Sequence, residues 1–191
     1  MAGKRPSSKH KILAAAVDLA HDSGPGSLSL EAVAKRAGVS KGGLLYHFPS
    51  KAKLMQGLVE EYLRNFEAAL EAATNPAEGK GEDLMSAYVR LSLIACDETH
   101  PPAAWIFSAM AEDPDFLYPL NEFRRKLLDR LKAHTPELAN VLTIYFVIEG
   151  LHSMKLFGAN LVSDDERKLI DQNLLAMAQT GAPPTTNQAQ E

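Results

Sequence analysis

The sequence predicts an all-α protein of about nine helices, in which a three-helix helix-turn-helix head precedes a helical-bundle domain. Three observations lead to this fold class. Apolar residues recur at helical spacing along most of the 191 residues. Breaks rich in Gly and Pro separate these periodic segments. The alternation of apolar and polar residues that marks a half-buried strand never reaches four repeats.

A first helix is predicted from a Ser7 or Ser8 cap to about Asp22, after a basic arm over residues 1–7. Its inner face is an apolar stripe at i, i+4, i+7 and i+8, formed by Ile12, Ala16, Leu19 and Ala20. The run SGPG at 23–26 then ends the helix.

Two short helices with a tight turn between them follow. Ser29 is the expected N-cap of a helix over 30–37, and Gly38 supplies the left-handed residue that ends it. Ser40 then caps a second helix over 41–47. Two short helices joined by a turn that contains Gly are the helix-turn-helix signature, and the second helix is predicted to enter the major groove of DNA.

This stretch resembles the TetR family of bacterial transcriptional regulators over about the first third of the chain. The matching residues are Ala34, Ala37, Gly38, Val39, Ser40, Lys41, Gly42, Leu44, Tyr46, His47, Phe48, Pro49, Ser50 and Lys51. The family usually carries Tyr two residues before the His, where this chain has Leu45 and Tyr46 follows. The resemblance implies a transcription regulator that binds a double-stranded DNA operator as a homodimer.

The residue types of the second helix suit contact with DNA. Lys41 can reach a guanine edge or a phosphate, and Tyr46 can donate to a phosphate oxygen. Gly42 and Gly43 let the helix backbone approach DNA closely, or they simply loosen the turn. Leu45 is expected to touch a thymine methyl or to pack inward. The predicted DNA-binding residues are Lys4, Arg5, Lys9, Ser29, Ser40, Lys41, Gly42, Gly43, Leu45, Tyr46, His47 and Lys51.

Charge is polarised along the chain. Residues 1–53 hold nine basic and three acidic side chains, a net charge of +6, although the whole chain carries −4. The other 138 residues hold eleven basic and twenty-one acidic side chains, a net charge of −10. A basic module followed by an acidic body is typical of a DNA-binding domain joined to an effector domain.

Composition narrows the class of protein further. The single cysteine, Cys96, excludes an internal disulfide and a cysteine-based zinc site. No apolar run is long enough to span a membrane, and the basic N-terminus has no apolar segment behind it. We therefore expect a cytoplasmic protein without a cofactor or metal.

The predicted domains are a DNA-binding domain over 1–49, an effector-binding and dimerisation domain over 50–180, and a disordered polar tail over 181–191. Thr135 is expected to cap one helix of the body, with Pro136 at its first position. Ser163 or Asp164 is expected to cap the last. The predicted helices of the body cover 50–73, 82–98, 103–112, 115–133, a segment that includes 141–151, and a last helix that ends near 179.

The segment 141–151 is apolar nearly all round but too short to span a bilayer. A helix of this kind in a small body needs a second partner surface, which a second subunit can supply. We therefore expect a homodimer through the last two helices. A dimer also fits DNA recognition, because one small head reads few base pairs and two heads read a near-palindromic site.

The resemblance also implies a pocket for a small, largely apolar effector in the body. The candidate lining residues are Tyr88, Trp105, Phe107, Met110, Phe116 and His152. Each of these alone also fits a packing role. The expected logic is repression that the effector relieves, and the reverse logic, an effector that favours DNA binding, stays open.

Two other classes stay open. An enzyme would need a catalytic motif, and the sequence offers only a Glu149-x-x-His152 spacing without a second copy and Cys96 near His100. A DNA-binding dimer could instead respond to a protein partner. A small-molecule effector would raise thermal stability by mass action, whereas a partner-controlled regulator would bind its operator and show no such ligand.

Overall fold

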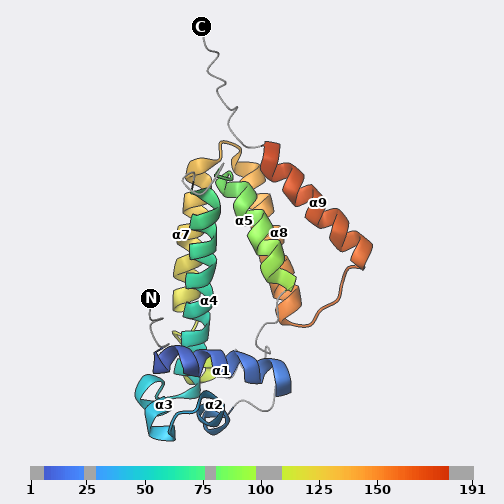
Figure 1. The fold of residues 1–191 in the computed structure, drawn as a ribbon. Coiled ribbons are helices and arrows are strands. Elements are labelled where there is room, and N and C mark those ends of the chain that lie inside the picture. The colour runs from blue at the N-terminus through green and yellow to red at the C-terminus, as the bar shows by residue number, and fades with distance from the viewer. Residues whose placement is uncertain (1–6, 24–28, 76–80, 98–108, 181–191) are drawn as a thin grey trace. The chain divides into compact units, whose positions relative to one another are not determined.

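The structure, a computed structural model, describes residues 7–23, 29–75, 81–97 and 109–180 of the chain. Within these ranges the regular structure is entirely helical, which confirms the all-α prediction. Residues 109–112 are also helical, whereas the rest of the helix predicted over 103–112 and the tail over 181–191 lie outside the described ranges. The labelled helices are α1 (Ser8–Ser23), α2 (Leu30–Ala37), α3 (Lys41–His47), α4 (Lys51–Thr74), α5 (Leu84–Asp97), α7 (Tyr118–His134), α8 (Leu138–Leu156) and α9 (Asp164–Thr180) (Figure 1).

Helix α2 begins and ends at its predicted capping residues, and helix α3 begins at its predicted cap. The Ser29 hydroxyl accepts a hydrogen bond from the Ala32 amide at 3.1 Å, and the Ser40 hydroxyl accepts one from the Gly43 amide at 3.0 Å. Gly38 ends α2 with a φ of 66°, a left-handed conformation that glycine adopts without strain. The local sequence therefore determines both helices of the helix-turn-helix.

The chain divides into two compact units. Unit 1 comprises Met1–Asn65 and Thr99–Phe123, and unit 2 comprises Phe66–Glu98 and Arg124–Glu191. Helices α4 and α7 contribute residues to both units, so this division differs from the boundary at residue 50 that the sequence suggests.

The core of unit 1 joins the first four helices to a segment much later in the chain. Phe116 is 1% exposed and packs in the same cluster as residues of α1, α2, α3 and α4. Gly57 of α4 is needed for this packing, because a Cβ there would lie 2.6 Å from Cε1 of Phe48. The fully buried members of the cluster include Ile12, Ala16, Val33, Leu44, Leu54 and Met55.

Asp113 holds the later segment against α4 and sets where α7 begins. One carboxylate oxygen of Asp113 accepts a hydrogen bond from the Lys53 ammonium at 2.7 Å, and the other accepts one from the Asp115 amide at 3.1 Å. The Phe116 amide donates to the Asp113 carbonyl at 3.0 Å. These bonds fold residues 113–117 into turns, so the helix predicted to begin at residue 115 begins at Tyr118 instead.

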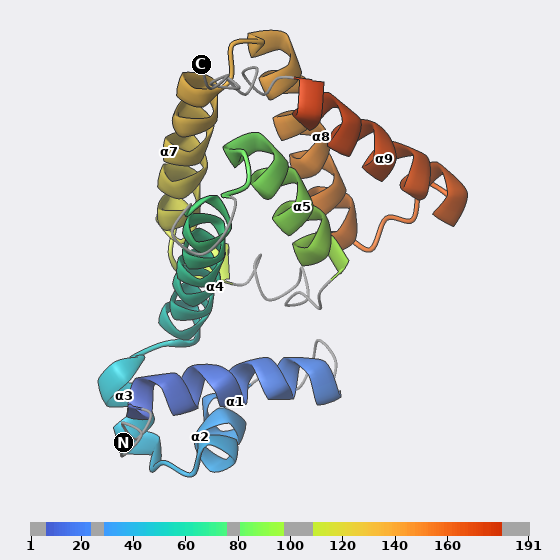
Figure 2. The same ribbon diagram turned by 45° about the horizontal axis from the view of Figure 1, so that its top comes forward.

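In unit 2, helix α5 contacts both α8 and α9, and Figures 1 and 2 show it running beside α8. Helix α8 buries one face, on which Ile144 and Ile148 are 0% exposed. Its Phe146 lies off that face and is 64% exposed. The predicted burial of 141–151 on more than one side is therefore only partly achieved within a single chain.

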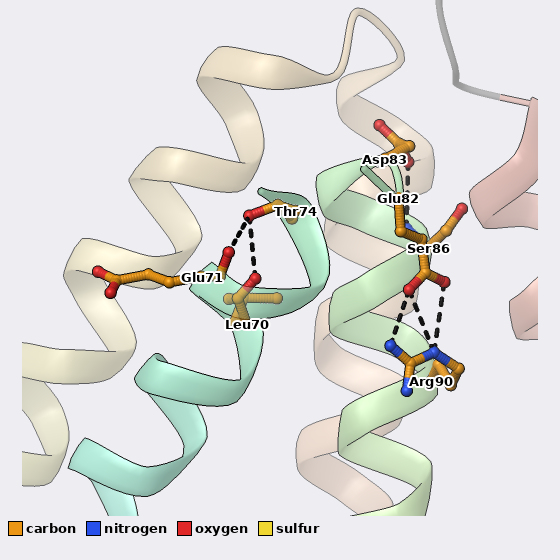
Figure 3. A network of polar contacts seen from close by, with 7 residues as sticks. All are labelled: Leu70, Glu71, Thr74, Glu82, Asp83, Ser86 and Arg90. Atoms are coloured by element: carbon orange, nitrogen blue, oxygen red, sulfur yellow. Dashed lines mark hydrogen bonds and ion pairs between the residues drawn. The ribbon is translucent and has the colours of Figure 1, made fainter. Parts of the chain in front are cut away.

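Polar side chains fix the start of α5 (Figure 3). The Asp83 carboxylate accepts a hydrogen bond from the Ser86 amide at 3.1 Å, and Glu82 pairs with Arg90 at 2.8 Å. At the end of α4, the Thr74 hydroxyl donates to carbonyls of its own helix. The end of α4 and the start of α5 thus both carry hydrogen-bonded polar side chains.

The last two helices differ in how well their starts are predicted. The prediction that Thr135 caps α8 is wrong, because Thr135 is buried and α8 begins at Leu138. The Leu138 amide donates to the Pro136 carbonyl at 3.2 Å, so Pro136 lies in a turn before the helix. At α9 the Ser163 hydroxyl accepts a hydrogen bond from the Glu166 amide at 3.3 Å, as a capping box requires.

We predict that Phe116→Ala destabilises unit 1 by about 3–5 kcal/mol, because it removes a fully buried ring from a packed core. Urea unfolding monitored by circular dichroism measures the loss. The matched control is Tyr118→Ala, since Tyr118 is 64% exposed and its loss leaves no cavity. Equal midpoints for the two variants would show that the later segment does not support the core of unit 1.

Candidate nucleic-acid interface

Helix α3 has one face in the core of unit 1 and one face open. Leu44 is 0% exposed, and Phe48, which follows the helix, is 3% exposed, so both anchor the helix from inside. Lys41, Gly42 and Tyr46 are exposed on the remaining surface. Because residues four apart lie one above the other on a helix, Gly42 and Tyr46 share one stripe.

Tyr46 is the most prominent side chain of this open face. It is 85% exposed, more than any other large apolar or aromatic residue among the described residues. The His47 ring lies edge-on to it, with ring centroids 5.1 Å apart. Leu45 and His47 are each half-buried. The phenol group of Tyr46 is therefore held out toward solvent, where it can donate a hydrogen bond to a ligand.

Lys41, the first residue of α3, is paired with an acidic residue of α2. Its ammonium lies 2.6 Å from a carboxylate oxygen of Glu31, and both side chains are 61% exposed. This hydrogen bond lowers the pKa of Glu31 from its ordinary value. From the sequence Glu31 is only an acid of the head, because it lies ten positions before Lys41 on a different helix.

The two glycines of α3 occupy different environments. A Cβ at Gly42 would meet no atom of the described residues within 4 Å, so these residues do not require glycine there. A Cβ at Gly43 would lie 3.2 Å from the Ser40 hydroxyl that caps the helix. Gly43 thus serves the N-cap, whereas the protein structure gives no reason for Gly42.

Basic residues flank the helix-turn-helix on both sides. Lys9 of α1 is half-buried, and its ammonium lies 5.9 Å from the centroid of the Phe48 ring, a cation–π distance. Lys51 opens α4 and is also half-buried. Lys4 and Arg5 lie outside the described residues.

The residues proposed for an effector pocket do not all belong to one unit. Phe116 and Met110 belong to unit 1, where Phe116 fills the core and Met110 is 39% exposed. Tyr88 and His152 belong to unit 2, where Tyr88 is 2% exposed and His152 is half-buried. Two further candidates lie outside the described residues: Trp105 and Phe107.

Unit 2 contains an aromatic cluster that only partly matches those candidates. Tyr88 stacks on Tyr145 with ring centroids 6.2 Å apart, and Phe66 meets Tyr88 edge-on at 6.5 Å. Burial raises the pKa of Tyr145 to about 12 and the pKa of Tyr88 well above its ordinary value. Glu149 pairs with Arg124 at 2.5 Å, and burial raises the pKa of the Glu149 carboxyl. Tyr145 is absent from the predicted pocket residues, since its place in an apolar run is typical of a core residue.

Cys96 and Glu149 are two of the residues that left an enzymatic function open in the sequence, and the structure describes the surroundings of both. Burial raises the pKa of the Cys96 thiol to about 11, so it is protonated at neutral pH and is a weak nucleophile. Its proposed partner His100 lies outside the described residues. Glu149 of the Glu-x-x-His spacing is in the ion pair with Arg124. No helix in the described ranges is long and apolar enough to cross a membrane.

Comparison with known families accounts for both halves of the chain. The protein-family model described as "bacterial regulatory proteins, tetR family" matches residues 12–58. The model described as tetracyclin repressor-like, C-terminal domain, matches residues 82–179, which is more than half of the chain. The first match contains α2, α3 and most of α1, and the second contains α5, α7, α8 and most of α9.

Individual relatives resemble different parts of the chain. The nucleoid occlusion factor SlmA of Marinomonas sp. (strain MWYL1) is 38% identical over 60 residues, which are 31% of this chain and 30% of that protein. A transcriptional regulator from Rhodococcus sp. Rha1 has a similar fold, with a TM-score of 0.64 at 20% identity over 92% of this chain and 96% of its own. The multidrug binding protein EbrR complexed with malachite green also has a similar fold, with a TM-score of 0.60 and 20% identity. The match covers 91% of this chain and 98% of that protein's chain.

We predict that Gly42→Ala leaves the fold intact and stabilises α3 by up to about 1 kcal/mol, because alanine is the better helix former and its Cβ would lie more than 4 Å from the other described residues. If the α3 backbone lies close to DNA, the same methyl group weakens DNA binding. Thermal unfolding and fluorescence anisotropy with a labelled duplex measure the two effects. Unchanged DNA affinity in the stabilised variant would exclude a close approach at residue 42.

Proposed function

The chain belongs to the TetR family of bacterial regulatory proteins, and on that premise we propose that it is a ligand-responsive repressor of transcription. It binds a near-palindromic operator as a homodimer and leaves it when a small, largely apolar effector binds the body. The observation that carries the DNA-binding part is the open face of α3, where Tyr46 is 85% exposed on a helix anchored by Leu44. Such a regulator works in the cytoplasm, with the DNA.

Each residue of the interface has a role that suits its environment. Lys41 reaches a base edge in the major groove, and Tyr46 donates to a phosphate oxygen. Leu45 is half-buried, so it contacts a thymine methyl at most with its outer atoms. His47 and Lys51 contact the phosphate backbone beside α3. The remaining contacts come from Ser29, Ser40, Gly42, Gly43 and the basic residues Lys4, Arg5 and Lys9.

The proposed dimer interface consists of α8 and α9. Large apolar side chains remain exposed on these helices in the single chain, which is the pattern of a surface covered by a partner. They include Phe146 at 64%, Leu169 at 58% and Leu175 at 36%. Two chains paired in this way carry two heads, and two heads are what a near-palindromic operator requires.

The proposed effector site lies in unit 2 around the aromatic cluster of Phe66, Tyr88 and Tyr145. Aromatic faces suit a flat, largely apolar molecule, and the Glu149–Arg124 pair adds polar groups nearby. A fold neighbour, the multidrug binding protein EbrR, is complexed with malachite green. An effector that prefers the released conformation by about 1–3 kcal/mol would shift the population away from the DNA-bound form.

A regulator controlled by a protein partner is the second candidate. The nucleoid occlusion factor SlmA of Marinomonas sp. is similar to this chain over only 60 residues. The chain spans about 30% of the length of such relatives, so the remaining parts of the two proteins can serve different purposes.

We predict that Lys41→Ala and Tyr46→Phe each weaken operator binding by about 1–3 kcal/mol while the dimer persists, because each removes one contact to DNA. Gel-shift titration and sedimentation velocity measure the two properties. Matched controls are Lys132→Ala and Tyr118→Phe on α7, which remove the same groups outside both the proposed DNA surface and the proposed dimer interface. Wild-type DNA affinity in both α3 variants would rule out α3 as the reading helix.

We predict that Phe146→Glu weakens dimerisation roughly tenfold or more, since it places a charge where an apolar anchor is expected. Phe146 is the sharper probe than Ile148, which is 0% exposed within one chain, so a charge at Ile148 would break the fold itself. Sedimentation equilibrium measures the dissociation constant. The control is Ile94→Glu on α5, where an exposed apolar residue lies outside the last two helices. If Phe146→Glu dimerises as tightly as the wild type, the dimer interface does not include Phe146 and lies elsewhere.

A further inference from the structure

The ion pair between Glu31 and Lys41 joins the two helices of the helix-turn-helix at the surface proposed to meet DNA. Glu31 lies in the first turn of α2, and Lys41 is the first residue of α3. Their charged atoms are 2.6 Å apart, within charge-assisted hydrogen-bond distance. The Lys41 ammonium is therefore already bound to a carboxylate before any DNA is present.

A lysine at this position would otherwise favour phosphate of any sequence. Its ammonium carries a full positive charge, which attracts any phosphate near it whatever the base sequence. Glu31 supplies the anion from within the protein, so a phosphate that approaches Lys41 must displace the carboxylate or accept its repulsion.

On the premise of the proposed function, we infer that Glu31 is a specificity-determining residue that positions Lys41 for a base edge and opposes its use on the phosphate backbone. An ammonium has three donors, of which Glu31 takes one. The other two can reach two acceptors at once, and guanine presents two, O6 and N7, in the major groove. Lys41 can therefore read a guanine without breaking the ion pair.

This role differs from a purely structural one in what it changes. Both side chains are 61% exposed, and an exposed ion pair contributes little to folding stability. Substitution of Glu31 therefore leaves the fold and the Tm close to wild type. The effect appears instead in the ratio of affinities for specific and non-specific DNA, and in the salt dependence that counts phosphate contacts.

The experiment compares the full-length wild type with Glu31→Gln on two duplexes of equal length. One duplex is selected from a random library by the wild type, and the other has a mixed sequence. We expect Glu31→Gln to bind the mixed duplex about three to five times more tightly, the range of one exposed ion pair, with a steeper salt dependence. Affinity for the selected duplex rises less, so the specificity ratio falls.

Two controls isolate the path through Lys41. Asp18→Asn removes an exposed acid of α1 and the same unit of charge, and we expect it to keep the specificity ratio. In a Lys41→Gln background, Glu31→Gln should have no further effect on the ratio. An equal effect in that background, or an equal effect from Asp18→Asn, would show general charge repulsion and overturn the inference.

Failure of the inference is distinct from failure of the proposed function. If the wild type enriches no duplex and binds none, the DNA-binding function itself is wrong. If the wild type binds and discriminates while Glu31→Gln keeps its ratio and salt dependence, the function stands and Glu31 has no part in specificity.

Discussion

The contact of the Phe48 ring with the backbone of α4 at Gly57 is the constraint on which the helix-turn-helix depends. A single Cβ at residue 57 would stand 2.6 Å from the ring, so the helix that follows α3 must lack a side chain at this point. Phe48 in turn ends α3 and fills the core beside Leu44. With the inner face of α3 fixed in this way, its outer face can carry residues chosen for a ligand rather than for packing.

The parts of the fold that depend on neighbours in sequence were predictable. Ser29 and Gly38 mark the two ends of α2, and Ser40 marks the start of α3, because a cap bonds to an amide or carbonyl within four residues. The start of α7 was not predictable, because a turn held by the contact of Asp113 with Lys53, sixty residues earlier in the chain, delays it. The role of Phe116 in the core of unit 1 was likewise not predictable, because it depends on contacts with helices much earlier in the chain.

The residues of the candidate sites also divide into those that follow from local sequence and those that depend on contacts between distant segments. Lys41 and Tyr46 follow from the helix-turn-helix pattern, and their exposure agrees with a surface that meets a ligand. Glu31 as a partner of Lys41, and Tyr145 as a partner of Tyr88, depend on which helices pack together. Periodicity places a residue on a face of its own helix, but it does not identify the residue opposite.

The buried thiol of Cys96 gives the chain a practical property for spectroscopy. It is the chain's single cysteine, and burial together with a pKa of about 11 keeps it unreactive toward maleimides at neutral pH. A cysteine introduced at an exposed position can therefore carry a fluorophore or spin label without removal of the native one. Distances between labels on the two heads of the proposed dimer can then be measured with Cys96 left in place.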